Sequence, residues 1–198
     1  MFQGFIVAVV TPFTRSGDYI DEDALRRLVR FDLEAGTDGI VPTGTTGEAP
    51  TLTEAEQRRV VELVVHEVGG TVPVIAGAGS KSPNHAIAAH QHAMAAGADA
   101  ALHVMGYYNR PSQEGIYQHF AAVAAAAPLP IVVYNVPPRT VIDILPATLT
   151  RIAGLPNAVG VKDATKDLAR PLAEQLLIAN PDFAWLSGED VTAVAYNS

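Results

Sequence analysis

The sequence predicts an α/β fold in which parallel strands close into a (β/α)8 barrel of the TIM type. Short β-branched segments alternate with longer Ala- and Leu-rich segments, at intervals of about 20 to 30 residues, the size of one strand–helix unit. Strands such as 131–133, Ile-Val-Val, are apolar throughout and need cover on both faces. A doubly wound open sheet would also supply that cover. Because no Gly-x-Gly-x-x-Gly follows the first strand and no Walker loop occurs, the barrel is favoured.

Seven segments have the β-branched composition of strands. The first is apolar, but it lacks a basic leader and Pro12 ends it far short of a membrane span, so a strand is predicted there. The later ones are bounded by Gly, Pro or Asp residues that are typical of turns. The predicted strands are residues 5–10, 39–42, 72–76, 100–104, 131–134, 158–162 and 183–187.

Helix start and stop signals lie between the strands. Asp21 precedes a helical run that reaches residue 34 before Ala-Gly. Thr53 and Glu56 have the spacing of a capping box for a helix that ends at the Gly-Gly pair after residue 68. A third helix starts with Ser82-Pro83 and ends at Gly97.

Length and composition limit the domain count and the chemistry. A chain of 198 residues predicts one domain, residues 1–198, whereas such barrels typically need about 250 residues. We therefore expect a barrel domain truncated after strand 7, without the final strand and helix and without C-terminal helices. The net charge of −8 argues against a nucleic-acid partner. The absence of cysteine excludes disulfides, thiolate nucleophiles and Cys-ligated metals, and suits a cytoplasmic protein without membrane contact.

Reactive residues of a barrel gather at the carboxyl ends of its strands. Lys162 ends the sixth predicted strand, and alternation places it on one face with Ala158 and Gly160, opposite Val159 and Val161. Burial there would depress the pKa of the amine and allow it to form a Schiff base with a carbonyl. A lysine that extends to solvent from a strand end is the alternative.

Other strand ends also carry polar residues. Tyr134 ends the fifth strand, where a phenol can relay protons, and the Pro-Pro pair that follows would present Arg139 to a carboxylate. The loop 43–48, Thr-Gly-Thr-Thr-Gly-Glu, could hold a small anion, and Thr45 could pass a proton to a phenol. Of the adjacent tyrosines in 107–108, one could face a site and the other a partner subunit. The alternatives are a packed core tyrosine at 134, a surface arginine at 139, a tight turn at 43–48 and core or interface packing of the tyrosines at 107–108.

No metal is predicted. His90 and His92 stand two apart on a predicted helix and so face different ways, and no His-Glu-x-x-His or Asp-rich calcium loop occurs. The histidines are interpreted as surface or helix-packing residues.

Together these segments resemble the dihydrodipicolinate synthase branch of the pyruvate-dependent class I aldolases, within the N-acetylneuraminate lyase superfamily. The resemblance runs from Gly4 to about Val191. It rests on five segments: Thr-Gly-Thr-Thr-Gly-Glu at 43–48, Tyr-Tyr-Asn-Arg-Pro at 107–111, Tyr-Asn-Val-Pro-Pro-Arg-Thr at 134–140, Gly-Val-Lys-Asp at 160–163 and Ser-Gly-Glu-Asp at 187–190.

The resemblance implies roles for individual residues. Lys162 matches the lysine that forms an imine with pyruvate, so no cofactor is expected beyond that covalent imine. Tyr134, Thr45 and Tyr108 match a proton-relay triad whose second tyrosine comes from the adjoining subunit, which implies a homo-oligomer, a dimer of dimers. Thr46 would bind the pyruvate carboxylate. The second substrate, L-aspartate 4-semialdehyde, would meet Arg139 through its carboxylate and Gly188 through the backbone.

Two loops bear on the choice of substrate within the superfamily. The paired threonines after Gly44 and the Val-Pro-Pro-Arg-Thr at 136–140 resemble the synthase, which feeds lysine biosynthesis, rather than the sialic acid lyases. Gly106 departs from the proline usual in the family. Another aldolase or dehydratase acting on sialic acid or a keto-deoxy sugar acid remains an alternative, as does a catalytically impaired truncated barrel that acts only in assembly.

The family's lysine-inhibited members bind lysine between subunits with an acidic residue on the third helix. The positions aligned with that site carry Pro50, Glu54, Gln57, Lys81 and His85. Because Lys81 is cationic and His85 replaces the acid, we expect weak or absent inhibition by lysine.

Overall fold

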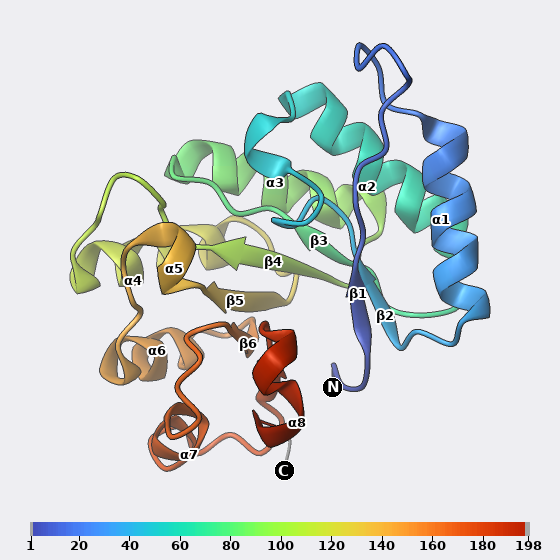
Figure 1. Ribbon diagram of the computed structural model, residues 1–198. Coiled ribbons are helices and arrows are strands. Elements are labelled where there is room, and N and C mark those ends of the chain that lie inside the picture. Colours follow the sequence, from blue (N-terminus) through green and yellow to red (C-terminus); the bar gives the residue numbers. More distant parts are fainter. Residues whose placement is uncertain (1, 197–198) are drawn as a thin grey trace.

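Parallel strands alternate with helices in the computed structural model, which describes residues 2–196 (Figure 1). The strands are β1 (Ile6–Ala8), β2 (Gly39–Val41), β3 (Ile75–Gly77), β4 (Ala100–Val104), β5 (Ile131–Asn135), β6 (Ala158–Asp163) and β7 (Ala184–Ser187). The helices are α1 (Glu22–Glu34), α2 (Glu54–Val68), α3 (Pro83–Ala96), α4 (Gln113–Ala126), α5 (Pro137–Thr140), α6 (Pro146–Ala153), α7 (Arg170–Gln175) and α8 (Ala193–Tyr196). Short 3₁₀ turns occupy Ala49–Thr51 and Asp190–Thr192.

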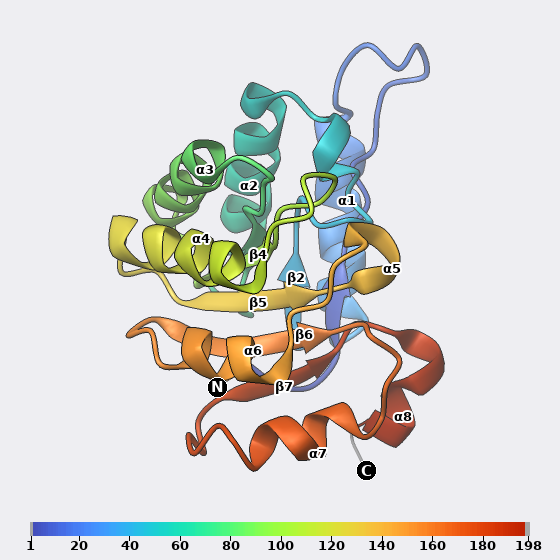
Figure 2. The same cartoon turned by 90° about the vertical axis from the view of Figure 1, so that its left-hand side faces the viewer.

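The strands lie side by side in chain order, as the barrel prediction requires. One sheet has the order β3-β4-β5-β6-β7, and β1 pairs with β2, every pairing being parallel. A bridge between Ile40 and Val74 joins β2 to β3. The helices α1 to α4 follow one another along the outside of the strands (Figure 1), and Figure 2 shows α6 and α7 on the side of β6 and β7. The carboxyl ends of the strands therefore meet on one face.

The predicted helix ends are confirmed. Asp21 caps α1 by accepting a hydrogen bond from the Ala24 amide, and Thr53 and Glu56 form the expected capping box of α2. Ser82 precedes α3 but makes no side-chain capping bond. Among the strands, β3 begins at Ile75 and not at Val72, because the proline nitrogen at 73 has no hydrogen for a sheet bond.

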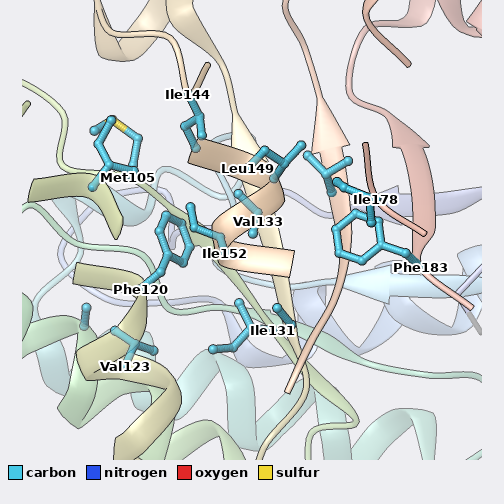
Figure 3. Packing of buried hydrophobic residues seen from close by; sticks show 14 residues of the cluster. Met105, Phe120, Val123, Ile131, Val133, Ile144, Leu149, Ile152, Ile178 and Phe183 are labelled. Carbon is cyan, nitrogen blue, oxygen red and sulfur yellow. The ribbon is translucent and has the colours of Figure 1, made fainter. Parts of the chain in front are cut away.

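The hydrophobic core has two layers. The outer layer lies between strands and helices, and Figure 3 shows Phe120 of α4 and Ile152 of α6 packed around Ile131 and Val133 of β5. The inner layer consists of strand residues that face away from the helices, Val132 among them. Since β5 is buried on both faces, its apolar sequence is explained by this double cover.

The sixth strand corrects one prediction. Val159 packs in the inner layer, whereas Ala158 and Val161 pack in the outer layer, so Val159 and Val161 do not share a face. The cause is an irregularity in the β5–β6 ladder, where Ile131 pairs with Ala158 but the next residue, Val132, pairs with Gly160. The extra residue shifts the alternation, and Lys162 keeps its inward position opposite Tyr134.

His103 also departs from the simple interpretation of the histidines. It lies on β4, not on the surface or a helix, and it is fully buried. Its Nε2 lies 3.1 Å from Nδ1 of His90 on α3, which is also fully buried. Within residues 2–196, no helix is long and apolar enough to cross a membrane.

Candidate active site

Lys162 lies near the carboxyl end of β6 with its side chain on the inner face of the strands. Burial lowers the pKa of the amine from its ordinary value, and the nearby Asp190 carboxylate opposes that shift. The amine nitrogen lies 4.9 Å from the centroid of the Tyr134 ring. A desolvated amine is neutral more often at a given pH than an exposed one, which is what a nucleophilic lysine needs.

Strand pairing explains why Lys162 and Tyr134 meet. The register of β5 and β6 places the two residues opposite each other, followed by the pair Asn135 and Asp163. Partners in a parallel ladder project to the same face, so the phenol and the amine share the inner face at the carboxyl ends of two neighbouring strands.

Tyr134 is buried, and Thr45 reaches it from the loop after β2. Burial raises the pKa of the Tyr134 phenol, while a side-chain hydrogen bond with Thr45 and the charge of Arg139 lower it. The Glu189 carboxylate adds a smaller upward effect. The phenol is therefore protonated at neutral pH and linked to a hydroxyl, an arrangement that can pass a proton.

The loop that carries Thr45 is anchored by its neighbour Thr43. This residue has a positive φ of 52°, and its hydroxyl donates a hydrogen bond of 2.9 Å to the Gly77 carbonyl. A side chain at Gly77 would place its Cβ 2.0 Å from the Thr43 carbonyl oxygen. Glycine at the end of β3 thus permits the close approach that fixes this loop against the sheet.

Two cavities meet at the predicted site, and Tyr134 and Arg139 line both. A cavity of about 240 Å³ contains Thr45 and Tyr107 in its lining. A larger open cavity of about 1050 Å³ contains Lys162, Thr46 and Gly188. The structure therefore brings together six of the seven residues predicted from the sequence, namely Thr45, Thr46, Tyr134, Arg139, Lys162 and Gly188.

Gly188 lies against the lysine side chain. A Cβ at this position would lie 3.0 Å from Cε of Lys162 and 3.1 Å from Cβ of Ala164. Its amide donates a hydrogen bond of 2.6 Å to the Asp163 carbonyl. Since that amide is already engaged, the carbonyl of Gly188 is the backbone group left for the contact with a substrate predicted from the sequence.

Tyr108 is the predicted residue that the structure does not place with the others. Its side chain is 83% exposed and its φ is +70°. Its only described ring contact is with Lys81, whose Nζ lies 5.5 Å from the ring centroid. Tyr107 faces the smaller cavity instead. A contribution of Tyr108 to the site of a neighbouring subunit stays a prediction.

Charged residues to which the sequence analysis gave no role lie near Lys162 and Tyr134. Asp190 acts on Lys162, and Arg170 is buried beside Asp143, Glu174 and Asp163. Their signal in the sequence is weak, because an isolated charged residue in a helix or loop is usually exposed. Within residues 2–196, no three His, Asp or Glu side chains are grouped as metal ligands would be.

A separate cavity of about 300 Å³ lies between α2 and α3. Pro50, Glu54, Gln57, Lys81 and His85 all line it, so the positions aligned with the family's lysine site do meet in space. His85 Nε2 lies 3.7 Å from a Glu54 carboxylate oxygen. The single acid of this set is therefore already beside an imidazole.

Comparisons with known proteins agree with this geometry. The family model described as the Dihydrodipicolinate synthetase family matches residues 1–198. A 4-hydroxy-tetrahydrodipicolinate synthase of Rhodospirillum centenum is 54% identical over 196 residues, and one of Rhizobium meliloti is 53% identical over 197 residues; each match covers 99% of this chain and 66% of the relative.

Solved structures are similar as well. The dihydrodipicolinate synthase of Aquifex aeolicus has a TM-score of 0.95 at 39% identity, covering 98% of this chain and 66% of that one. The chloride-inhibited enzyme of Acinetobacter baumannii, solved with pyruvate, has a TM-score of 0.95 at 44% identity, covering 99% and 67%. The chain thus spans about two thirds of the length of the relatives it matches. With its family match over residues 1–198 and its identities above 50%, this chain belongs to the dihydrodipicolinate synthetase family.

Proposed function

We propose that this chain carries the active centre of a Schiff-base-forming lyase that condenses pyruvate with L-aspartate 4-semialdehyde to give 4-hydroxy-tetrahydrodipicolinate, a step of lysine biosynthesis. The observation that carries the proposal is the half-buried Lys162 amine, 4.9 Å from the ring of a phenol that is itself hydrogen-bonded to Thr45. The names of the relatives, 4-hydroxy-tetrahydrodipicolinate synthases at about half identity, support this choice of substrates.

The first step is imine formation. The neutral amine of Lys162 attacks the keto carbon of pyruvate, and loss of one water from the carbinolamine gives an iminium ion. The lowered pKa of Lys162 increases the neutral fraction that can attack. Thr46 lines the cavity that contains the amine, where its hydroxyl can bind the pyruvate carboxylate.

The second step is proton removal. The iminium ion withdraws electrons from the neighbouring methyl carbon, so that carbon loses a proton and an enamine forms. Tyr134 and Thr45 form the part of the relay that lies in this chain, and Tyr108 of an adjoining subunit would extend it to solvent. This role of Tyr108 makes a homo-oligomer, a dimer of dimers, part of the proposal.

The third step forms the carbon–carbon bond. The enamine carbon attacks the aldehyde carbon of the semialdehyde, whose oxygen takes up a proton and becomes the hydroxyl of the product. The amino group of the semialdehyde then displaces Lys162, which closes the ring and restores the free amine. The net loss of one water is the one expelled during imine formation, so no cofactor is consumed. Arg139, which lines both cavities, would hold the carboxylate of the semialdehyde.

The test is to trap the imine. The chain is incubated with pyruvate and borohydride, and intact-mass measurement followed by peptide mapping locates the adduct. We expect one adduct on Lys162, its loss in K162R, and its retention in K166R. Lys166 is a suitable control because it lies in the loop that follows β6, four residues beyond Lys162, but is exposed and paired with Glu189 at 3.3 Å. Absence of the adduct from the folded parent chain contradicts the proposal and favours the impaired-barrel alternative.

A second measurement identifies the aldehyde. Condensation is measured with aspartate semialdehyde and with the aldehydes that sialic acid and keto-deoxy sugar acid aldolases use. We expect turnover with the semialdehyde, and in R139M a rise in KM for it with unchanged trapping of pyruvate. Preference for a sugar aldehyde would leave the imine chemistry in place but overturn the choice of second substrate.

A further inference from the structure

A buried arginine connects α7 to the face that carries the site. Arg170 is the first residue of α7 and is only 8% exposed. Its guanidinium donates to Glu174 at 2.8 Å, to Asp143 at 2.5 Å, and to the carbonyl of Ile144. The planar fork of an arginine can satisfy three acceptors in different directions, which the single nitrogen of a lysine cannot do.

The hydrogen bonds continue from Asp143 to the end of β5. The other Asp143 oxygen accepts a hydrogen bond of 2.8 Å from the side-chain amide of Asn135, and the Asn135 side-chain oxygen accepts one of 3.2 Å from the Ile144 amide. Asn135 is the residue directly after Tyr134, and its backbone carbonyl accepts a bond of 2.8 Å from the Ala164 amide beyond β6. The chain of bonds from Arg170 therefore ends at Asn135, the residue that follows Tyr134 on β5.

The same network fixes the segment that follows α5. Residues 141–145 continue directly from the helix that presents Arg139, and Val141 has a positive φ of 67°. Gln113 of α4 holds this segment from another side, donating to the Asp143 carbonyl at 2.8 Å and accepting from the Leu145 amide at 3.1 Å. Arg170 thus connects with both elements that carry the phenol and Arg139.

The stability of the fold does not by itself explain a buried ion pair at this position. Burial of an ion pair costs desolvation energy, and well-packed apolar residues often serve stability as well or better. Here one arginine and two carboxylates occupy a place against the core, where Ile144 is fully buried. What an apolar cluster could not supply is directional bonds to Asp143 and to the backbone at Ile144.

We propose that Arg170 is a positioning residue that holds Tyr134 against Lys162, acting through Asp143 and Asn135. The inference rests on the proposed function and adds a residue that touches neither substrate. Lys162 itself stands on β6, which the network meets through the backbone bond from the Ala164 amide to the Asn135 carbonyl, whereas Tyr134 stands on the same strand as Asn135. Loss of Arg170 therefore impairs the proton step in which the phenol takes part more than it impairs attack of the amine on pyruvate.

Two readouts separate these steps. Borohydride trapping measures formation of the imine, and exchange of the pyruvate methyl protons in D₂O, followed by NMR, measures proton removal to the enamine. The variant Y134F serves as the reference, because it gives the exchange rate of a chain that lacks the phenol hydroxyl. In R170M we expect exchange to fall about tenfold or more while the trapping rate changes by less than about threefold, since small displacements of a reacting group cost this much. R170K keeps the positive charge but loses the planar fork of the guanidinium, so its exchange rate should lie between those of R170M and the parent chain.

The controls test for a purely structural role. R151M removes an arginine of α6 that pairs with Glu114 at 2.8 Å on the surface, and should alter neither readout. D143N is the second test variant. An asparagine has only one side-chain oxygen, so it can accept a hydrogen bond from only one of the two groups that donate to Asp143. Because Asp143 is 35% exposed, we expect D143N to fold even if R170M does not.

The outcomes are distinguishable. Exchange in D143N and R170K equal to that of the parent chain overturns the inference, as does a parallel fall of trapping and exchange that follows the loss of folded protein. If the parent chain traps no pyruvate at all, the proposed function fails instead, and the role of Arg170 fails with it.

Discussion

A methyl group at Gly188 would press against Lys162, its Cβ lying 3.0 Å from Cε and 3.1 Å from Cγ of that lysine. Lys162 is the residue before the last of β6 and Gly188 follows directly on β7, and the Gly188 amide bonds to the carbonyl of Asp163, the residue after the lysine. The backbone at 188 therefore cannot move away without breaking the extension of the β6–β7 ladder. The lysine side chain must move instead.

We expect G188A to slow imine formation without unfolding the chain. The substitution pushes the lysine side chain from its place beside Tyr134 by less than about 1 Å, and a displacement of this kind costs roughly three- to tenfold in rate. The measurement is the rate of borohydride trapping with pyruvate. G115A is the matched control, because Gly115 lies in α4 with ordinary contacts of 3.4 Å, where alanine favours the helix. A trapping rate in G188A equal to that of G115A would contradict the prediction.

The pH dependence of trapping is expected to follow Lys162. Only the neutral amine attacks, so the rate rises with pH through a pKa that burial has lowered below 10.5. Asp190 raises that pKa, so D190N lowers it further and moves the acid limb of the profile to lower pH. The rate of trapping is measured from neutral to alkaline pH. D182N, an exposed carboxylate that does not act on the lysine, should leave the limb in place. A shift to higher pH in D190N would disprove this assignment.

These relationships differ in how far the sequence predicted them. Tyr134 and Lys162 meet because strand ends of a parallel sheet share one edge, and that inference needs only the strand order. The irregularity at Val159 was not predictable, because an extra residue in a strand leaves no mark on composition. Arg170, at the start of α7, and Asp143, in the loop before α6, lie 27 residues apart, and their burial is decided by tertiary packing. The sequence pattern predicted the residues at strand ends but not the residues that support them.

Lysine is expected to give no thermal stabilisation. Lys81 and His85 line the cavity between α2 and α3, and the Glu54 carboxylate there already lies 3.7 Å from the imidazole. The ammonium group of a bound lysine would be repelled by Lys81, and the cavity has no free carboxylate to balance the two positive charges. H85E adds that acid and should produce stabilisation by lysine. Thermal-shift titrations with lysine test both chains, with pyruvate as the positive control. A large shift in the parent chain would show that the charge argument is wrong.

Acid is expected to destabilise the fold through the buried histidines between β4, α3 and α4. Burial lowers the pKa of His103 well below 6.5, and His90 and His119 repel its proton further. His90 and His119 are themselves lowered by burial. A histidine whose folded pKa is depressed contributes stability above its unfolded pKa, and that contribution is lost as pH falls below about 6.5. The free energy of unfolding should therefore decrease from pH 7.5 to pH 5.5.

The substitution H103L isolates this effect. At pH 7.5 it leaves His90 Nδ1 without its partner at 3.1 Å and should cost about 1–3 kcal/mol. Its loss of stability on acidification should nonetheless be smaller than that of the parent chain, because one buried imidazole no longer resists protonation.

The raised pKa values of Asp163 and Glu174 act in the opposite direction in both chains, so they cancel in the comparison. H66Q, at an exposed position of α2, should show the same slope of the free energy of unfolding against pH as the parent chain. Urea unfolding at the two pH values measures each slope, and equal slopes in H103L and H66Q would show that His103 is not the group that titrates.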